Sequence, residues 1–435
     1  LLAVGTVVRI ALIAGGGVRI ALRDDDVADA VGLGRDDEDA ANGPGRYLVL
    51  NGSRAKEIVA ALAVRDDVTI AWSSVERWRT AKANVENLRV ALAERKHYWL
   101  GLEGGLSLDG LADDVDLADV LRALREGRRY VMHRGGDGDV LIALTDALAD
   151  AAAPLAASTS APALSALRDR GARFDASPLW ASLQSDLEKA RVVDGEPAPA
   201  LRAALRPYQK DGVRFLRRLA LWKTGGILAD DMGLGKTVQT IALLLDRAPL
   251  GPQLVVSPTS VCFNWADELA RFSPTLDVVR YEGSKRKSSL TNVTSNTIVV
   301  VSYAIVQRDA DELAKTTWST LVLDEAQQVK NAGTRRAKAI RALHAGVRIA
   351  LTGTPLENHT GELWAIFDAV SPGLFGSWSE FKARFASPIE KDADVRRRKT
   401  LAKAIAPFVL RRKKKDVAPE LPARTEVNQH LPLEA

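Results

Sequence analysis

Residues 226–237 read GILADDMGLGKT, an apolar strand that runs into a glycine-rich turn ending in Gly-Lys-Thr. This order is typical of a phosphate-binding loop, in which backbone N–H groups and the lysine surround the phosphates and the hydroxyl holds Mg²⁺. Residues 320–325 read TLVLDE, a second apolar strand that ends in two carboxylates. One carboxylate there can hold Mg²⁺, and its neighbour can accept a proton from an attacking water. Together the two motifs predict a site that hydrolyses a nucleotide.

The predicted roles follow from the chemistry of each side chain. Lys236 is expected on the β- and γ-phosphates, Thr237 and Asp324 on Mg²⁺, and Glu325 as the general base. Three of these, Lys236, Asp324 and Glu325, form the predicted catalytic set. The remaining loop positions expected to bind the nucleotide are Met232, Gly233, Leu234 and Gly235. The loop departs from the strict pattern in one place, because Asp230 stands where its first glycine would be.

From about residue 200, apolar β-branched segments alternate with amphipathic ones. The predicted strands are 225–229, 253–257, 297–302, 320–325 and 348–353. This alternation predicts an α/β fold with a doubly wound parallel sheet, whose ligands bind at the carboxyl ends of the strands. Both motifs, and the TGTP sequence after the last strand, lie just past strand ends.

The first 195 residues have a different pattern, which predicts an α+β domain. VRIAL occurs at 8–12 and 18–22 around a run of glycines, which favours a β-hairpin. Residues 98–109 and 128–144 also favour hairpins, and 117–127 favours a helix. Residues 146–167, rich in alanine, serine and proline, fit either a helix or a linker.

Composition narrows the class of protein. The 435 residues are 46% hydrophobic and 26% charged, as in ordinary globular proteins, and no apolar run reaches the length of a membrane span. A single cysteine suits a reducing cytoplasm, and the five histidines have no metal-ligand spacing. The net charge of +5 is compatible with nucleic acid but does not argue for it alone. The chain lacks an initiator methionine, so a fragment is expected.

Several weaker candidates each have a simpler alternative. The amide of Gln209 could read the edge of adenine, or it could be a surface glutamine. Thr259 could contact a nucleic-acid phosphate or only cap a helix. The remaining candidates for nucleic acid are Lys330, Asn331, Thr352, Gly353 and Thr354, each of which also fits an ordinary loop or turn. The basic runs 396–399 and 411–415 fit either solvated surface or a DNA contact.

Seven segments, taken in order, resemble the first RecA-like lobe of a Swi/Snf-type ATPase. They are LRPYQ, ADDMGLGKT, VVSPTSVCFNW, VVSYAIV, VLDEAQQVKN, ALTGTPLEN and FVLRRKKKDVAPELPARTE, within residues 205–430. The resemblance implies ATP and Mg²⁺ as cofactors and movement along double-stranded DNA without strand separation. It assigns Gln209, Lys236, Thr237, Asp324 and Glu325 to the nucleotide, and Thr259, Asn331 and the 352–354 segment to DNA or to coupling. Gln327 replaces the more common histidine.

The resemblance also sets the expected organisation. It implies an N-terminal extension over 1–195 like that of bacterial members, a first lobe over 196–408, and an inter-lobe hinge over 409–435. A second lobe in the same polypeptide, carrying arginine fingers, is expected as the partner of this one. Arg411 and Arg412 are poor substitutes for those fingers, because they fall in the hinge.

Rival functions are a strand-separating or RNA helicase, and a nucleotide-gated module that binds DNA or protein. Expected partners are double-stranded DNA and a DNA-bound protein or RNA polymerase, with no membrane and a cytoplasmic, nucleoid-associated location.

Overall fold

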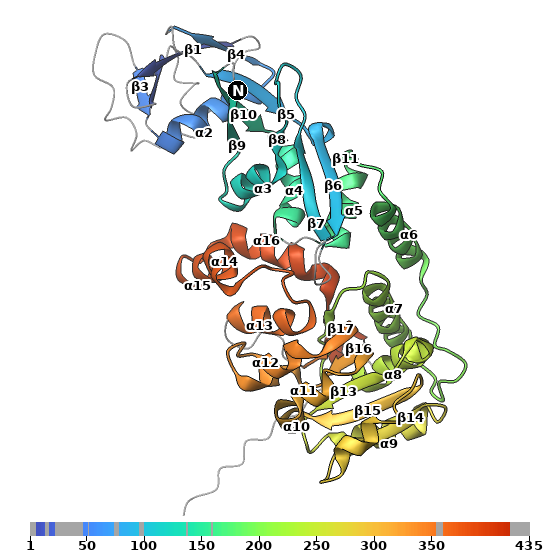
Figure 1. Cartoon of the computed structure of the whole chain (residues 1–435). Coiled ribbons are helices and arrows are strands. Elements are labelled where there is room, and N and C mark those ends of the chain that lie inside the picture. The colour runs from blue at the N-terminus through green and yellow to red at the C-terminus, as the bar shows by residue number, and fades with distance from the viewer. Residues whose placement is uncertain are drawn as a thin grey trace, which may run out of the picture. The chain divides into compact units, whose positions relative to one another are not determined.

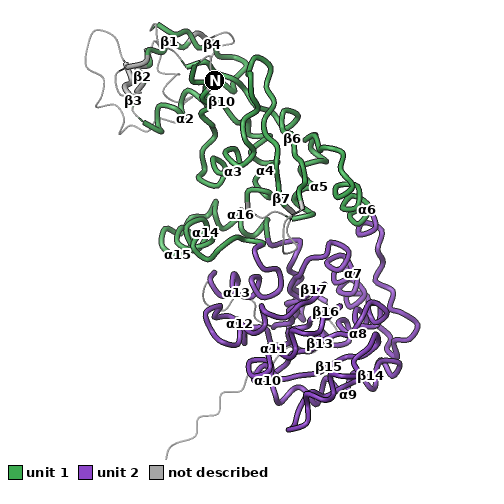
Figure 2. Tube along the Cα trace, viewed as in Figure 1, with its two compact units in different colours: residues 1–187, 374–404 green, residues 188–373, 405–435 purple. Residues whose placement is uncertain are grey.

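The computed structural model describes residues 6–13, 17–21, 47–50, 52–73, 78–94, 100–135, 138–157, 160–353 and 360–417 (Figure 1). The chain divides into two compact units, shown in Figure 2. Unit 1 holds residues 1–187 and 374–404, and unit 2 holds residues 188–373 and 405–435. Among the described residues, no helix has the length and apolar character needed to cross a membrane.

Unit 2 is built on a seven-stranded sheet with the order β14-β15-β13-β16-β17-β12-β18. Each pair of neighbouring strands is parallel. The strands are β12 (Gly226–Leu228), β13 (Gln253–Ser257), β14 (Asp277–Arg280), β15 (Thr297–Ser302), β16 (Thr317–Leu323), β17 (His344–Leu351) and β18 (Val409–Leu410). The predicted parallel sheet and its five predicted strands are confirmed. The two strands without a prediction, β14 and β18, are short and form the edges of the sheet.

Helices cover both faces of this sheet. They are α7 (Pro207–Leu221), α8 (Lys236–Arg247), α9 (Cys262–Phe272), α10 (Tyr303–Arg308), α11 (Ala310–Leu313), α12 (Arg335–Ala342), α13 (Thr360–Val370) and α17 (Lys414–Val417). Helices α9 and α10 both pack on β15, and α7 and α13 both pack on β17. Because every residue of β15 is buried, helices must lie on its two faces, as double winding requires.

The strand order brings the predicted motifs together. Strands β13, β16, β17 and β12 are consecutive neighbours, and all run in the same direction. The loops that follow them, which begin at 258, 324, 352 and 229, therefore leave one edge of one sheet. This is the edge at which ligands bind in sheets of this kind.

Unit 1 contains three small sheets with the orders β3-β2-β1-β4, β5-β10-β9 and β11-β6-β7-β8. Their strands are β1 (Thr6–Ile13), β2 (Gly17–Ala21), β3 (Tyr47–Leu50), β4 (Val68–Trp72), β5 (Arg79–Ala83), β6 (Leu88–Glu94), β7 (Leu100–Leu106), β8 (Val115–Asp116), β9 (Tyr130–Gly135), β10 (Gly138–Leu144) and β11 (Arg173–Phe174). The helices are α2 (Gly52–Ala63), α3 (Leu117–Arg125), α4 (Asp146–Ala157), α5 (Ala161–Asp169), α6 (Pro178–Val192), α14 (Trp378–Phe381), α15 (Ser387–Lys391) and α16 (Val395–Ile405). Two separate hydrophobic clusters form its core.

Most of the local predictions for this region hold. Strands β1 and β2 pair antiparallel, as do β9 and β10, so two predicted hairpins are confirmed. The predicted helix is α3, with Asp116 as its N-cap. The ambiguous segment after 145 forms helices α4 and α5, whose apolar side chains belong to the core.

The hairpin predicted at 98–109 is wrong. Strand β7 runs straight through Gly104 and Gly105 and pairs with β6 on one side and β8 on the other. The glycines are needed for close approach, because a Cβ on Gly104 would lie 2.3 Å from the carbonyl oxygen of Arg89. A Cβ on Gly105 would lie equally close to that of Val115, at 2.3 Å. Two glycines can thus permit tight packing within a strand as well as a turn.

The structure divides the chain differently from the three consecutive segments expected from the sequence. Residues 374–404, expected inside the first lobe, group with the N-terminal region. Arg384 donates to the carbonyl oxygen of Ala156 at 2.6 Å, and Arg397 to that of Arg125 at 2.6 Å. Both acceptors lie in the last turns of helices α4 and α3, where carbonyl groups lack partners within the helix. Burial lowers the pKa of Arg384 to about 10.

Candidate functional site

The loop between β12 and α8 has the backbone of a phosphate-binding loop. Gly233 and Gly235 have φ values of +83° and +76°, a region that favours glycine. Gly235 is the N-cap of α8, and no side chain caps this helix. The N–H groups of its first turn therefore remain available to an anion, and the helix dipole favours one there.

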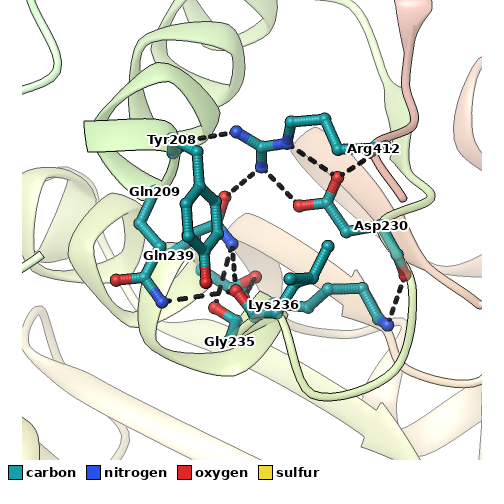
Figure 3. A network of polar contacts seen from close by, with 9 residues as sticks. Tyr208, Gln209, Asp230, Gly235, Lys236, Gln239 and Arg412 are labelled. Atoms are coloured by element: carbon teal, nitrogen blue, oxygen red, sulfur yellow. Dashed lines mark hydrogen bonds and ion pairs between the residues drawn. The ribbon is translucent and has the colours of Figure 1, made fainter. Parts of the chain in front are cut away.

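Lys236 begins α8 and turns back across the loop (Figure 3). Its ammonium donates to the carbonyl oxygen of Asp230 at 2.8 Å. Burial lowers the pKa of Lys236, while the carboxylates of Glu325, Asp230 and Asp324 act in the opposite direction. The lysine predicted to bind phosphate is thus a half-buried cation placed between the loop and the carboxylates after β16.

Asp324 is fixed by three contacts. One carboxylate oxygen accepts from the indole N–H of Trp265 at 2.8 Å, and the other from the backbone N–H of Glu325 at 2.9 Å. The hydroxyl of Tyr303 donates to the carbonyl oxygen of Asp324 at 2.8 Å. Burial, the largest effect, raises the pKa of Asp324. A half-buried carboxylate held in one orientation is suited to bind a cation.

Glu325, the predicted base, has an unusual backbone. Its φ of +47° and ψ of 54° lie in the left-handed region, which is strained for a residue with a Cβ. The amide of Gln327 donates to its carboxylate at 2.6 Å and accepts from the hydroxyl of Thr352 at 2.9 Å. A continuous chain of hydrogen bonds therefore joins the predicted base to the loop after β17. No titratable group is needed at position 327 for this connection.

The oxygen donors present fit Mg²⁺. Asp324 and the hydroxyl of Thr237 are hard ligands of the kind this ion prefers. The Glu268 carboxylate lies close to both groups: the Asp324 charge and a hydrogen bond from Thr237 affect its pKa, which burial raises. It is therefore a third oxygen donor at this place. No group of three or more His, Cys, Asp or Glu able to hold a metal occurs in the described part of the chain. Mg²⁺ usually takes one or two protein carboxylates together with water and substrate phosphates, so a sparse set is suitable. When bound, the ion neutralises charge on the transferred phosphoryl group.

Gln209 lies beside the loop and is already engaged. Its carbonyl oxygen accepts from the backbone N–H of Arg206 at 2.9 Å, and its amide donates to the carbonyl oxygen of Leu234 at 3.3 Å. Adenine recognition by Gln209 stays a prediction and would require these bonds to be exchanged. The loop side chains also differ from one another, because Leu234 is 1% exposed and Met232 is 71% exposed.

The candidates for nucleic acid are not equivalent. Thr259 and Asn331 are exposed in loops after β13 and β16. Lys330 forms an ion pair with Glu362 at 3.1 Å. Thr352 is fully buried and Gly353 is half-buried, while Thr354 lies outside the described residues. Among the candidates that the structure describes, Thr259 and Asn331 are therefore the two with exposed side chains.

Four further polar residues lie at this site without having been predicted there from the sequence: Gln239, Trp265, Glu268 and Tyr303. Trp265 and Glu268 are three residues apart in α9, which places them on one helix face. That spacing, directly after a predicted strand and turn, is the signal that could have identified both.

The chain is similar to known proteins over its C-terminal half. The model of the SNF2-related domain matches residues 208–435. A putative ATP-dependent helicase/translocase YwqA of Bacillus subtilis is 42% identical over 61% of this chain and 30% of its own length. The TATA-binding protein-associated factor mot1 of Schizosaccharomyces pombe is 38% identical over 52% of this chain and 13% of its own length.

A solved structure, the Sulfolobus solfataricus SWI2/SNF2 ATPase core in complex with dsDNA, is 43% identical over 52% of this chain and 48% of that one, with a TM-score of 0.49. The chain spans less than a third of the length of YwqA and of mot1, the two curated relatives named above. Because the family model covers more than half of the chain, this protein belongs to the SNF2-related domain family.

Proposed function

We propose that this chain is the ATP-hydrolysing part of a motor that moves along double-stranded DNA without separating its strands. The observation that supports this best is the convergence of Lys236, Asp324 and Glu325 at one edge of the unit 2 sheet, in a chain of the SNF2-related family. Each residue has the chemistry its role needs: a cation for phosphate, a fixed carboxylate for Mg²⁺ and an adjacent base.

The same edge offers a route from DNA to hydrolysis. Thr259 and Asn331 are exposed beside it, and we propose that they contact the phosphate backbone. Thr352 does not face solvent, so its proposed role is coupling: it holds Gln327, which holds Glu325. A change in the loop after β17 would then alter the position of the base. For Lys330 to reach DNA, it would have to leave Glu362.

The curated relatives are much longer than this chain, and we propose that a second RecA-like lobe in the same polypeptide completes the catalytic site. That lobe would supply arginine fingers to the transferred phosphoryl group. From the DEAQ sequence at 324–327 and the single cysteine, we propose a bacterial, cytoplasmic, nucleoid-associated protein that displaces a DNA-bound protein or RNA polymerase.

Steady-state ATP hydrolysis by the full-length protein, with duplex DNA, single-stranded DNA or RNA added, tests the proposal. We expect duplex DNA to give the strongest stimulation, and we expect no release of a labelled strand from a partial duplex. Stronger stimulation by single strands, or strand release, would favour a helicase. Nucleotide binding without hydrolysis under any condition would favour a nucleotide-gated binding module.

A parallel assay of residues 1–435 tests the need for a second lobe. An arginine finger contributes about 10³–10⁵ in rate in related systems, so we expect slow hydrolysis and no DNA stimulation from this chain alone. DNA-stimulated turnover at nearly the full-length rate would show that the site is complete within these residues.

A further inference from the structure

Arg412 lies two residues beyond β18, in the basic run 411–415. The sequence favours a solvated or DNA-facing side chain there, but the Arg412 side chain is only 12% exposed. Figure 3 shows its guanidinium directed toward Asp230, Gln239 and Tyr208. The proposed hydrolysis gives this largely buried arginine no role. Its contacts indicate a role in positioning other residues.

The first partner of Arg412 is the carboxylate of Asp230, at the start of the phosphate-binding loop. The side chain donates Nε to Oδ1 at 2.9 Å and Nη2 to Oδ2, and the backbone N–H of Arg412 also donates to Oδ1 at 3.1 Å. Asp230 is completely buried. A buried carboxylate requires compensation by a cation or by hydrogen bonds, and Arg412 provides both.

The second partner, Gln239, extends this contact to the far end of the loop. Arg412 donates to the amide oxygen of Gln239 at 2.8 Å, and the Gln239 amide donates to the carbonyl oxygens of Leu234 and Gly235 at 3.2 and 3.1 Å. This arrangement requires the glycine at position 212 of α7, because a Cβ there would lie 1.7 Å from the Gln239 side-chain oxygen. Both ends of the loop are therefore held from one guanidinium.

The third partner lies in the first turn of α7, where Arg412 donates to the carbonyl oxygen of Tyr208. The next residue is Gln209, the candidate for adenine recognition. Arg412 thus contacts the elements expected to surround both the phosphates and the base of the nucleotide.

Main-chain bonds strengthen the connection between the loop and the 410–414 segment. The N–H of Ala229 donates to the carbonyl oxygen of Leu410 at 2.7 Å, and that of Asp231 to the carbonyl oxygen of Arg412 at 3.0 Å. The N–H of Lys414 donates to the carboxylate of Asp231 at 3.0 Å. A displacement of either segment must therefore disturb the other.

Asp230 is the point at which this network meets the phosphate-binding lysine. Its carbonyl oxygen accepts from Lys236, and its carboxylate accepts from Arg412. Because nucleotide phosphates would draw Lys236 away from that carbonyl, nucleotide binding changes the surroundings of the residue that holds Arg412.

We propose that Arg412 is a positioning residue of the nucleotide site, through which the segment after β18 and the phosphate-binding loop report on each other. The proposal rests on the nucleotide-binding part of the proposed function. It explains why an aspartate occupies the position of the first loop glycine: the carboxylate is the attachment point for Arg412.

Arg412→Lys tests the proposal with the least disturbance, since a lysine keeps the charge beside Asp230 but cannot also reach Gln239 and Tyr208. We expect the variant to melt close to the wild-type temperature and to bind a fluorescent ATP analogue about tenfold more weakly, a coupling of ordinary size. Arg217→Gln is the matched control. Arg217 pairs with Asp246 at 2.7 Å between the same helices α7 and α8, but at the end of α8 away from the loop. Arg217→Gln should lower the melting temperature and leave the affinity for the ATP analogue unchanged.

A second readout follows the segment itself. Trypsin cleavage within 411–415 should change in rate when Mg·ATP analogue is added to the wild-type chain. In Asp230→Asn and in Arg412→Lys, cleavage should become independent of nucleotide. The proposal is overturned if Arg412→Lys binds as tightly as wild type, or if both variants keep the wild-type response of cleavage to nucleotide. If the wild-type chain itself binds no nucleotide, the proposed function fails, which is a distinguishable result.

Discussion

Two aspartates of unit 2, the buried Asp309 and the half-buried Asp324, have opposite electrostatic surroundings. Asp309 accepts from Arg286 at 2.6 and 3.0 Å and from the hydroxyl of Tyr281 at 3.0 Å. The Arg286 guanidinium is the main reason that the pKa of Asp309 is lowered. Asp324 accepts from two neutral N–H groups, and burial raises its pKa.

This difference is the one expected between a structural carboxylate and a carboxylate that binds a metal ion. The charge of Asp309 is compensated by Arg286. Burial, together with the hydrogen bond to Asp309, raises the pKa of Tyr281 to about 12. Among the described residues, Lys236 is the cation that lowers the pKa of Asp324, and its effect is smaller than that of burial. Perturbed carboxylates at a strand end are candidates for function for this reason.

The largest expected effect comes from removing the Lys236 ammonium, which we propose binds the nucleotide phosphates. Lys236→Ala should abolish measurable binding of a fluorescent ATP analogue, because the main side-chain cation of the loop is lost. Lys338→Ala, at an exposed position of α12, is the control and should bind as wild type. Wild-type affinity in Lys236→Ala would remove the loop from the nucleotide site.

The next effect concerns the base. Glu325→Gln in the full-length protein should bind ATP normally and hydrolyse it about 10²–10⁴ times more slowly, since an amide cannot accept the proton. Glu282→Gln, at an exposed position near β14, should not change turnover. A Glu325→Gln variant that hydrolyses at half the wild-type rate would exclude this residue from proton transfer.

How far the sequence predicts this site depends on the distance between the contacting residues. Lys236, Asp324 and Glu325 could be assigned because a strand and its following turn lie within one short segment. Arg412 could not, because its contact with Asp230 joins residues 182 positions apart through the pairing of β18 with β12. The short strand β18 has too few residues to show a periodic pattern.

The fold was predictable in the same way: local patterns could be predicted from the sequence, and contacts between distant segments could not. Buried parallel strands are continuous apolar runs, so β13 and β15 were predicted with their observed bounds. In unit 1, Gly104 and Gly105 were assigned to a turn because close approach of Arg89 and Val115 is a property of the assembled sheet. The grouping of 374–404 with the N-terminal region likewise depends on contacts between distant segments.

A smaller effect is expected at the compensated carboxylate. Asp309→Asn should lower the melting temperature at pH 7, because Arg286 loses its charged partner. A lowered pKa means that the ionised group stabilises the fold above the ordinary carboxyl pKa of about 3.9, and that this contribution is lost as pH falls through the lower folded value. The difference from wild type should therefore narrow on acidification, as measured by thermal melts between pH 7 and pH 3.

Asp311→Asn, in the first turn of α11, is the control for that series and should follow wild type throughout. If the difference in melting temperature between Asp309→Asn and wild type widened as the pH fell, the ion pair of Asp309 with Arg286 would not be what stabilises the fold here.

The most direct test of the contrast is the Mg²⁺ dependence of nucleotide binding in Asp324→Asn and Asp309→Asn, measured by titration calorimetry with and without EDTA at a temperature where both are folded. We expect wild type and Asp309→Asn to bind an ATP analogue more tightly with Mg²⁺, and Asp324→Asn to lose this dependence. An Asp324→Asn variant that keeps the full Mg²⁺ dependence would contradict the assignment of Asp324 to the metal.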